Sequence, residues 1–354
     1  MKTVLLIHQD YIQHYRISVY NYLNSFLENF GYKLVVYSSG IEKNNPFKIN
    51  FCFVEKVFNT SNLKSILKKF KPDASIFFIN LRRKYFFPFL FLLKNHNIPL
   101  IYWGHGRDLT DLYNPLKNIL YFAIQSFSDA IILYSREQKK YISSSHHNKV
   151  FIANNSLNLT IYDNLKINRK DILNKYKIHT GKNIIFIGRI QKRKRVDDLI
   201  AAFKLIKESN NGLILSGPDV DHITTNLKDS QIFKLPAMYG KSAIELLHSA
   251  DIYCLPGHVG LGIVDAFYCS LPIVTEDVPH APEIMYFHEG INGFMVPKGD
   301  IAALANKLKL LLNDDQLRWR MGKAARETYE TEAHINNMAL GFKKAIEYAI
   351  INRK

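Results

Sequence analysis

Short apolar runs alternate along the chain with longer stretches in which hydrophobic residues recur every three or four positions. This alternation predicts parallel strands connected by helices, because a helix must cross back along the sheet before the next parallel strand can begin. It disfavours a sandwich of antiparallel strands. The predicted strands form two series, one at 4–7, 33–37, 75–79, 100–103, 130–134 and 150–153, and one at 183–188, 213–215, 231–235, 251–255, 272–275 and 293–296.

A polar stretch over 155–180 separates the two series and predicts the connection between two domains. The length of 354 residues agrees with two domains of about 150 residues each. We expect an α/β fold with a first domain over 1–165, a second over 166–335, and a C-terminal helix over 336–354 that packs back toward the first. Each domain is expected to be a doubly wound parallel sheet, and the chemistry is expected in a cleft at the carboxyl ends of the strands.

Two local patterns predict helices in the second domain. The form Ser-x-x-Glu at Ser242 and Glu245 predicts a capping box just before a helix. Apolar residues spaced three or four apart predict another helix with one buried face, formed by Val196, Leu199, Ile200, Phe203 and Ile206.

The composition is that of a folded globular chain, with 47% hydrophobic and 22% charged residues. Three cysteines fit no metal or disulfide spacing, so we expect a reducing, cytoplasmic compartment. The first residues have too short an apolar run for a signal peptide. The longest apolar and aromatic run, Tyr85–Leu93, has about half of the ~20 residues that a membrane-spanning helix needs, so no span is expected.

The net charge of +16 is concentrated in the first half. Residues 1–180 hold 25 Lys and Arg against 11 Asp and Glu, whereas 181–354 hold 22 against 20. A genome rich in Lys codons would spread the charge evenly, so we favour a basic half that faces an anionic membrane surface or acceptor, with solubility alone as the alternative. The run Arg82–Lys84 before Tyr85–Leu93 suits a headgroup layer, at the inner face of the cell membrane, and equally a core helix with a basic cap.

A cationic loop follows the strand that ends at Gly188. Residues 189–195 hold five Lys and Arg, and a helix is predicted to begin near Val196. Cations at the carboxyl end of a strand, next to a helix start, suit a diphosphate, whose charges need paired counterions. Solvated charge without a ligand is the alternative.

A glycine-rich segment follows the strand at 251–255. Gly257, Gly260 and Gly262 would let the backbone approach a ligand closely, and free amides before the next helix could hold a phosphate or sugar oxygen. Alone, this segment could be a tight turn. Together with the cationic loop it indicates a ligand site.

With these two loops in place, the chain resembles retaining glycosyltransferase family 4 over roughly 180–300. The order and spacing of the motifs match that family's carboxyl-terminal domain, and the first half matches more loosely. The motifs are Gly188-Arg189-x4-Lys194, Leu215-Ser216-Gly217, Ala250–Pro256, Gly260-Leu261-x3-Asp265-Ala266, Leu271–Thr275, Pro282-Glu283-Ile284 and Asn292-Gly293-Phe294-x-Val296, with Tyr15-Arg16, Trp103–Gly106, Ser135 and Lys149-Val150-x3-Asn154-Asn155 in the first half.

The resemblance implies a GT-B architecture, in which two Rossmann-like domains face each other and the second holds a nucleotide diphosphate sugar. It implies that Arg189 and Lys194, after Gly188, bind the donor diphosphate and stabilise the leaving nucleoside diphosphate. Asp265 takes the second acidic position of the family's Glu-x7-Glu element, where the carboxylate accepts hydrogen bonds from the ribose hydroxyls. The first acidic position falls on Gly257, which has no side chain to touch the donor sugar. We therefore expect the amides of Val259, Gly260 and Leu261, helped by His258, to take over that contact.

Further residues correspond to the family's other site elements. His105 matches the histidine that contacts the transferred sugar near its reacting carbon, and a packed or capping histidine is the alternative. Glu283 matches the acid close to the donor and is equally able to cap the helix that starts there. His280 is a further candidate, and Tyr15 and Arg16 match acceptor-side elements.

The expected function is transfer of a hexosyl group, with retention, from a nucleotide diphosphate sugar to a hydroxyl of a glycan or lipid-linked intermediate in surface-polysaccharide biosynthesis. No opposed carboxylate pair supports hydrolysis. No essential metal or cofactor is expected, because the paired acids 197–198 and 314–315 fall at helix starts. The alternatives are an epimerase or phosphorylase on the same scaffold, and a nucleic-acid-binding protein, suggested by the pI of about 9.5 but without a recognition motif, so we expect no nucleic acid.

Overall fold

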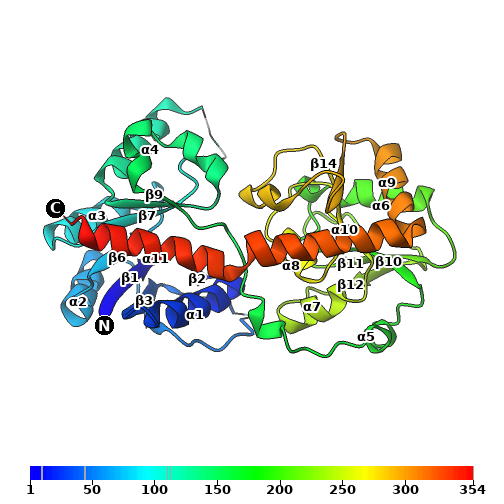
Figure 1. Ribbon diagram of the computed structural model, residues 1–354, viewed down its shortest axis with the longest axis horizontal. Coiled ribbons are helices and arrows are strands. Elements are labelled where there is room, and N and C mark those ends of the chain that lie inside the picture. Colours follow the sequence, from blue (N-terminus) through cyan, green and yellow to red (C-terminus); the bar gives the residue numbers. More distant parts are fainter. Residues whose placement is uncertain (9–10, 44, 110, 112, 354) are drawn as a thin grey trace. The chain divides into compact units, whose positions relative to one another are not determined.

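The computed structural model describes residues 1–8, 11–43, 45–109, 111 and 113–353, and this part of the chain divides into two units (Figure 1). Unit 1 comprises Met1–Asn158 and Ile335–Lys354, and unit 2 comprises Leu159–His334. The domain boundaries expected at 165/166 and 335/336 thus fall at 158/159 and 334/335. The first lies earlier because residues after Asn158 already bond within unit 2, where the Tyr268 hydroxyl donates to the Asp163 carboxylate over 3.2 Å.

Unit 1 contains a seven-stranded sheet in which all neighbouring strands are parallel, in the order β5-β3-β1-β6-β7-β8-β9. The six strands predicted in the first half are present. The structure adds β5, which the sequence analysis missed because three of its four residues are only partly buried and the fourth is exposed, and a small separate pair, β2 and β4. The strands are β1 (Lys2–Ile7), β2 (Tyr11–Ile12), β3 (Tyr32–Ser38), β4 (Gly40–Ile41), β5 (Cys52–Glu55), β6 (Ala74–Phe77), β7 (Leu100–Gly104), β8 (Ala130–Leu133) and β9 (Val150–Ile152).

Helices cover both faces of this sheet, as the alternation of strand side chains requires. Val4 and Leu6 of β1 belong to a core with α1 and α11, whereas Leu5 and Ile7 belong to a second core with α2, α3 and Ile124 of α4. The C-terminal helix α11 runs along the sheet of unit 1 (Figure 1). The helices are α1 (His14–Glu28), α2 (Thr60–Phe70), α3 (Phe86–Asn95), α4 (Pro115–Phe127) and α11 (Ile335–Ile351).

Unit 2 contains a six-stranded parallel sheet in the order β12-β11-β10-β13-β14-β15, so the first strand, β10, lies in the middle and the chain order reverses beside it. All six strands predicted in this half are present. The strands are β10 (Lys182–Ile187), β11 (Asn211–Ser216), β12 (Ile232–Leu235), β13 (Ile252–Cys254), β14 (Ile273–Glu276) and β15 (Gly293–Val296), and the helices are α5 (Arg169–Lys175), α6 (Val196–Leu205), α7 (Lys241–Leu247), α8 (Gly262–Tyr268), α9 (Ile301–Asn313) and α10 (Asp315–Thr328).

The helix predictions in unit 2 had different outcomes. The predicted apolar face is buried in α6, with Ile206 buried just beyond its end. The predicted capping box is wrong, because Ser242 lies inside α7. The residue that precedes α7 is Gly240, with φ +58°, a conformation that glycine adopts readily.

The aromatic run at 85–93 forms α3, with Phe86, Phe89 and Leu93 buried and Phe87 and Phe91 exposed. It is therefore a core helix that keeps part of its surface in solvent. No helix in the described ranges combines the length and the apolar composition that crossing a bilayer demands.

Candidate active site

The cationic loop of unit 2 leaves the sheet at the carboxyl end of β10. Gly188 has φ +146°, and its amide donates to the Ser216 carbonyl over 2.9 Å. A Cβ on the neighbouring Gly217 would lie 2.7 Å from the Gly188 carbonyl carbon, so both glycines are needed where the two loops meet. This contact fixes the point at which the cationic loop, residues 189–195, leaves the sheet.

The cations of this loop have different surroundings. Arg195 points into unit 2, where its Nε lies 2.7 Å from Oε2 of the buried Glu276, so it holds the loop in place. Lys194 is partly buried and donates to the His258 carbonyl. Burial and the neighbouring charge of Arg193 lower the pKa of Lys194 to about 8, with Glu283 acting in the opposite direction. Arg189 is exposed at the carboxyl end of β10.

The glycine-rich loop binds directly to the cationic loop. The amides of Gly257 and His258 donate to the carbonyls of Lys194 and Arg193, both over 3.0 Å. A Cβ on Gly257 would lie 2.5 Å from the carbonyl carbon of Lys194 and 2.6 Å from its Cα, closer than real Cβ atoms come. The glycine at the first acidic position of the family element is therefore required by backbone packing, since any side chain would displace the cationic loop.

The three amides expected to contact the donor differ in the structure. The Val259 amide donates to His280 Nδ1 over 3.0 Å, and His280 Nε2 donates to the Glu276 carbonyl, also over 3.0 Å. His280 is therefore a neutral histidine that links the glycine-rich loop to the end of β14, and burial lowers its pKa. In the described part of the chain, the amides of Gly260 and Leu261 have no protein acceptor. These two amides point to a ligand position just before α8.

Two carboxyl groups belong to this region. Asp265 lies in α8, and burial raises its pKa to about 7. Burial, followed by the charge of Asp265, raises the pKa of the nearby Tyr253 and Tyr162 hydroxyls. Glu283 is buried in the first turn of a short 3-10 helix, Pro282–Tyr286, whose cap position, Ala281, has no side-chain cap. Glu283 therefore does not occupy the cap position, and its charge acts on Lys194.

In unit 1, the structure brings His105 and Arg16 together around aromatic rings. The Arg16 guanidinium lies 4.9 Å from the Trp103 ring centre and 5.7 Å from that of Tyr134, and the His105 ring lies 4.6 Å from Tyr134. Tyr15 lies beside Arg16, with 5.4 Å between its ring centre and the guanidinium. Together these residues form a cationic and aromatic cluster after β7 and at the start of α1.

The protonation state of His105 follows from its neighbours. Its Nδ1 lies 2.7 Å from Nε2 of Gln138, whose Oε1 accepts from the Tyr134 amide. Because the Gln138 amide nitrogen can only donate, Nδ1 accepts and Nε2 carries the proton. Burial and the Arg16 charge lower the pKa of His105 to about 4. His105 is therefore neutral at pH 7, with an N–H available at Nε2.

The sequence analysis missed His8 in this region. His8 directly follows β1, and its Nδ1 lies 2.6 Å from the Tyr20 hydroxyl. Burial and the charge of Arg16 lower its pKa to about 3. Its position after the first strand was the available signal, since the carboxyl ends of parallel strands share one edge of the sheet.

The described residues contain no group of three or more His, Cys, Asp and Glu side chains placed to hold a metal ion. Among the described residues, unit 2 contributes the cations Arg189 and Lys194 and the amides of Gly260 and Leu261, which lack a protein acceptor. Unit 1 contributes the neutral His105 beside the buried Arg16.

Comparisons with known proteins show similarity to glycosyltransferases. Residues 168–328 match the family model described as glycosyl transferases group 1. N-acetyl-alpha-D-glucosaminyl L-malate synthase of Bacillus anthracis is 28% identical over 241 residues, which cover 63% of this chain and 61% of the relative. The N,N'-diacetylbacillosaminyl-diphospho-undecaprenol alpha-1,3-N-acetylgalactosaminyltransferase of Campylobacter jejuni is 22% identical over 87% of this chain and 84% of that protein.

Solved structures show the same fold over the whole chain. A glycosyltransferase from Rickettsia africae has a TM-score of 0.82 at 17% identity, covering 99% of each chain. Anabaena Alr3699/HepE in complex with UDP has a TM-score of 0.73 at 13% identity, covering 98% of this chain and 100% of that one. The protein therefore has the GT-B fold, and residues 168–328 are similar to the group 1 glycosyl transferases.

Proposed function

We propose that this protein is a retaining glycosyltransferase that moves a sugar from a nucleotide diphosphate sugar to a hydroxyl of a glycan or lipid-linked acceptor. The observation behind this proposal is that unit 2 holds the cations Arg189 and Lys194 after β10 and, before α8, the amides of Gly260 and Leu261, which have no acceptor among the described residues. The UDP complex of a protein with the same fold supports a nucleoside diphosphate as the ligand.

In the proposed reaction, the bond from the anomeric carbon to the β-phosphate oxygen breaks as the acceptor oxygen bonds to that carbon. The electron pair of the broken bond leaves with the nucleoside diphosphate, which also takes the acceptor proton. Negative charge develops on the diphosphate, where Arg189 and Lys194 stabilise it more strongly in the transition state than in the bound donor. With a pKa of about 8, Lys194 is mostly protonated at pH 7.

Other residues have roles in binding and orientation. We assign Asp265 to the ribose hydroxyls, for which its carboxyl oxygens are acceptors in either protonation state. The Nε2–H of His105 donates to a hydroxyl of the transferred sugar, and its lowered pKa keeps a positive charge away from the reacting carbon. Arg16 and Tyr15 serve the acceptor side. Because the cations neutralise the diphosphate, the reaction needs no metal.

Two observations support an acceptor carried on a lipid at a cytoplasmic membrane face. Unit 1 holds 24 Lys and Arg against 10 Asp and Glu, which favours anionic partners. The Campylobacter relative is named for a diphospho-undecaprenol acceptor.

A thermal-shift panel of nucleoside diphosphates and their sugars tests the donor assignment. One nucleoside diphosphate should raise the melting temperature of the wild type. Arg189→Ala should lose this shift, whereas Arg320→Ala, which removes an exposed arginine from α10, should keep it. An equal shift in the two variants would overturn the assignment.

Product analysis separates the proposed reaction from its alternatives. NMR spectroscopy of the product should show the anomeric configuration of the donor, and an inverted product would rule out retention. Conversion of the nucleotide sugar without any acceptor would instead indicate an epimerase.

A further inference from the structure

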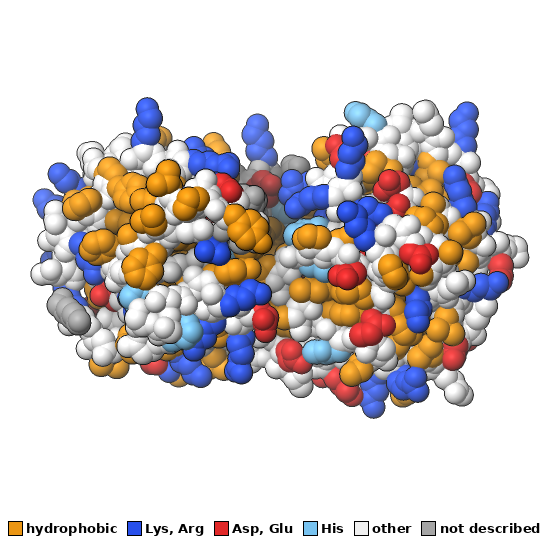
Figure 2. All heavy atoms as spheres, turned by 90° about the horizontal axis from the view of Figure 1, so that it is seen from above, with side chains coloured by type: hydrophobic (Ala, Val, Ile, Leu, Met, Phe, Trp, Pro, Cys, Tyr) orange, Lys and Arg blue, Asp and Glu red, His pale blue; other side chains and the backbone are white. Residues whose placement is uncertain are grey.

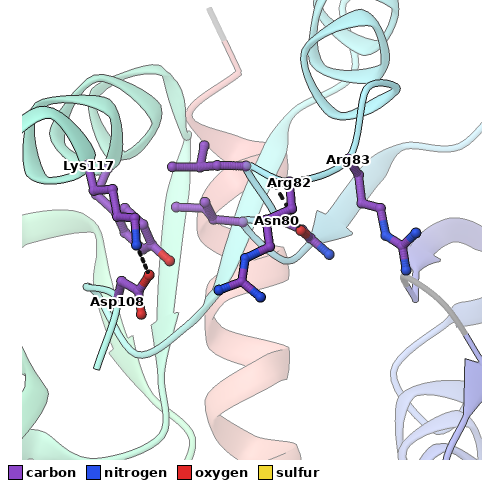
Figure 3. Close-up of a pocket in the computed structure, with 8 residues that line it drawn as sticks. Asn80, Arg82, Arg83, Asp108 and Lys117 are labelled. Carbon is purple, nitrogen blue, oxygen red and sulfur yellow. Dashed lines mark hydrogen bonds and ion pairs between the residues drawn. The ribbon is translucent and has the colours of Figure 1, made fainter. Parts of the chain in front are cut away.

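Unit 1 contains a polar pocket of about 510 Å³ (Figure 3). Small-molecule sites in proteins have volumes of about 300–1,000 Å³, so the pocket suits a small ligand. The loop after β6 lines it with Asn80 and Arg82, the loop after β7 lines it with Asp108, and helix α4 lines it with Lys117 and Tyr121. Because both loops follow parallel strands, the pocket lies at the edge of the sheet where open α/β folds bind their ligands.

Hydrogen bonds hold the loop after β7 against helix α4. The Gln125 side chain donates to the Gly106 carbonyl over 2.6 Å, and Arg107 Nε donates to Asn118 Oδ1 over 2.8 Å. Gln125 and Asn118 belong to α4, and Gly106 and Arg107 belong to the loop. The two pocket walls that these segments form are therefore fixed relative to each other.

The pocket follows directly on the cationic and aromatic cluster along both loops. The Phe78 ring lies 4.6 Å from the Trp103 ring of the cluster, and Phe78 comes just before the pocket residues 79–82. His105, another member of the cluster, comes three residues before Asp108. The pocket thus adjoins the residues that we assign to the transferred sugar and to the acceptor side.

One cation of the pocket has no partner in the described part of the chain. Lys117 Nζ lies 3.0 Å from Asp108 and 2.8 Å from Asp111, so it pairs with both carboxylates. Arg83 already has an interaction of its own, and we assign it no role. The Arg82 guanidinium has no hydrogen bond or ion pair with a described residue, whereas its backbone amide donates to Asn80 Oδ1 over 3.3 Å.

The direction of the Arg82 side chain distinguishes it from other surface cations. Lys and Arg side chains are spread over the surfaces of both units in Figure 2, so exposure alone indicates no ligand. Figure 3 shows the Arg82 guanidinium turned toward the side of the pocket where Asp108 lies, whereas that of Arg83 points the other way. Arg82 therefore offers its N–H groups to the interior of the pocket.

Neutral polar groups complete the lining. Burial, followed by the charge of Asp108, raises the pKa of Tyr121 to about 12. The Tyr121 hydroxyl is therefore neutral at pH 7 and can both donate and accept a hydrogen bond. The Asn80 side-chain amide adds N–H donors. Such groups suit the hydroxyls of a sugar.

The charges indicate which anion the pocket accepts. A guanidinium pairs bidentately with either a carboxylate or a phosphate. A phosphate monoester carries a charge of about −1.5 to −2 at pH 7, more than one arginine balances beside Asp108 and Asp111. A carboxylate brings a single negative charge, which matches the one arginine without a partner.

We propose that this pocket is an acceptor subsite that selects a sugar bearing a carboxylate, and that Arg82 is the residue that determines this specificity. The carboxylate accepts two N–H groups of Arg82, while hydroxyls of the same sugar bond to Tyr121 and Asn80. This inference rests on the proposed glycosyl transfer and adds the chemical class of the acceptor, a glycan that presents a uronic acid or a similar sugar acid.

Two glycosides that differ in one group test the subsite. In NMR titrations the wild type should bind methyl β-D-glucuronide at least about tenfold more tightly than methyl β-D-glucoside, because hydrogen bonds to a charged group are the stronger ones. Arg82→Gln should bind the two glycosides equally. Lys84→Gln is the matched control, because Lys84 is exposed nearby but does not line the pocket, and it should keep the wild-type preference.

A further variant separates the carboxylate contact from the hydroxyl contacts. Tyr121→Phe should weaken the binding of both glycosides by about fivefold and leave their ratio unchanged, because both carry the hydroxyls. A ratio that falls to one in Tyr121→Phe, with Arg82 intact, would contradict the assignment of the carboxylate to Arg82. Melting curves establish that each variant folds.

Four other results would overturn the proposal. They are equal binding of the two glycosides by the wild type, an unchanged preference in Arg82→Gln, a lost preference in Lys84→Gln, and tighter binding of glucose 6-phosphate than of methyl β-D-glucuronide, which would make the site one for phosphate. The thermal shift by a nucleoside diphosphate reports on unit 2 separately. A failed glycoside test with an intact shift contradicts only the acceptor class, whereas the absence of a shift with every nucleoside diphosphate contradicts the proposed function itself.

Discussion

Replacement of Gly257 by alanine tests whether the cationic loop and the glycine-rich loop of unit 2 form one structural element. The added Cβ would lie 2.5 Å from the Lys194 carbonyl carbon and 2.6 Å from its Cα, with the Arg193 carbonyl oxygen closer still. All three atoms belong to the backbone, so no flexible side chain can move aside. Overpacking of this kind costs about 1–3 kcal/mol, and we expect the upper part of that range.

Gly260→Ala is the matched control three residues later. The nearest atom to its added Cβ is the Cβ of Ala281 at 3.9 Å, an ordinary van der Waals contact. Alanine there should leave the free energy of unfolding unchanged or raise it by about 0.4–1 kcal/mol, because it restricts the unfolded chain.

Thermal denaturation measures both effects. For a unit of this size, about 1 kcal/mol corresponds to a change in melting temperature of about 2–4 °C. Gly257→Ala should therefore melt about 6–12 °C lower and lose part of its stabilisation by a nucleoside diphosphate, since the cationic loop must move. Gly257→Glu, which restores the family's acidic residue, should be destabilised as well and gain no donor affinity. If Gly257→Ala proves as stable as Gly260→Ala, the backbone contact does not require glycine.

Three further changes have defined outcomes. Arg195→Met removes the cationic partner of the buried Glu276 carboxylate, which keeps a hydrogen bond from the Gly299 amide, and should lower the free energy of unfolding by about 3 kcal/mol in urea denaturation, whereas the exposed Arg193→Ala should change it by less than about 0.5 kcal/mol. Because burial raises the pKa of Asp265 to about 7, the native protein holds a proton that the unfolded chain releases above its ordinary pKa of about 4, so stability should fall as pH rises from 4 to 7; Asp265→Asn should remove this part of the pH dependence and melt higher than the wild type at pH 8. Sugar transfer should continue at an unchanged rate in EDTA, and loss of turnover that Mg²⁺ restores would contradict the assignment of the diphosphate charge to the protein's cations.

The positions of the strands could be predicted from the sequence because buried parallel strands appear as apolar runs. Every strand predicted for the two series is present, since runs such as those at 4–7 and 183–188 are apolar enough to be buried on both faces. The strand β5 was not predicted because none of its residues is fully buried. The capping box at Ser242 was wrong for a local reason: Gly240, with its positive φ, precedes the first turn of α7 and puts Ser242 inside the helix.

The candidate site was predictable in outline and less so in its contacts. The sequence located the cationic loop but not the inward turn of Arg195, which depends on Glu276 eighty-one positions away. Likewise, nothing local indicated that His280 would take the Val259 amide or that Gly257 would meet the backbone of Lys194. Such contacts between loops arise only when the strands that support them become neighbours in the sheet.

The exposed side of α4 illustrates a further limit of sequence patterns. Hydrophobic periodicity predicts which side chains share a face, but it does not tell whether that face meets the core. Leu116 and Ile119 follow the spacing of buried residues and yet lie in solvent. Only the structure separates the core residue Ile124 from them.

A crystal structure with bound nucleoside diphosphate tests the proposed chemistry most directly. We predict that the diphosphate oxygens lie within hydrogen-bonding distance of the Arg189 guanidinium, the Lys194 ammonium group and the amides of Gly260 and Leu261. A diphosphate bound in unit 2 away from these four residues, or held in unit 1, would contradict the account.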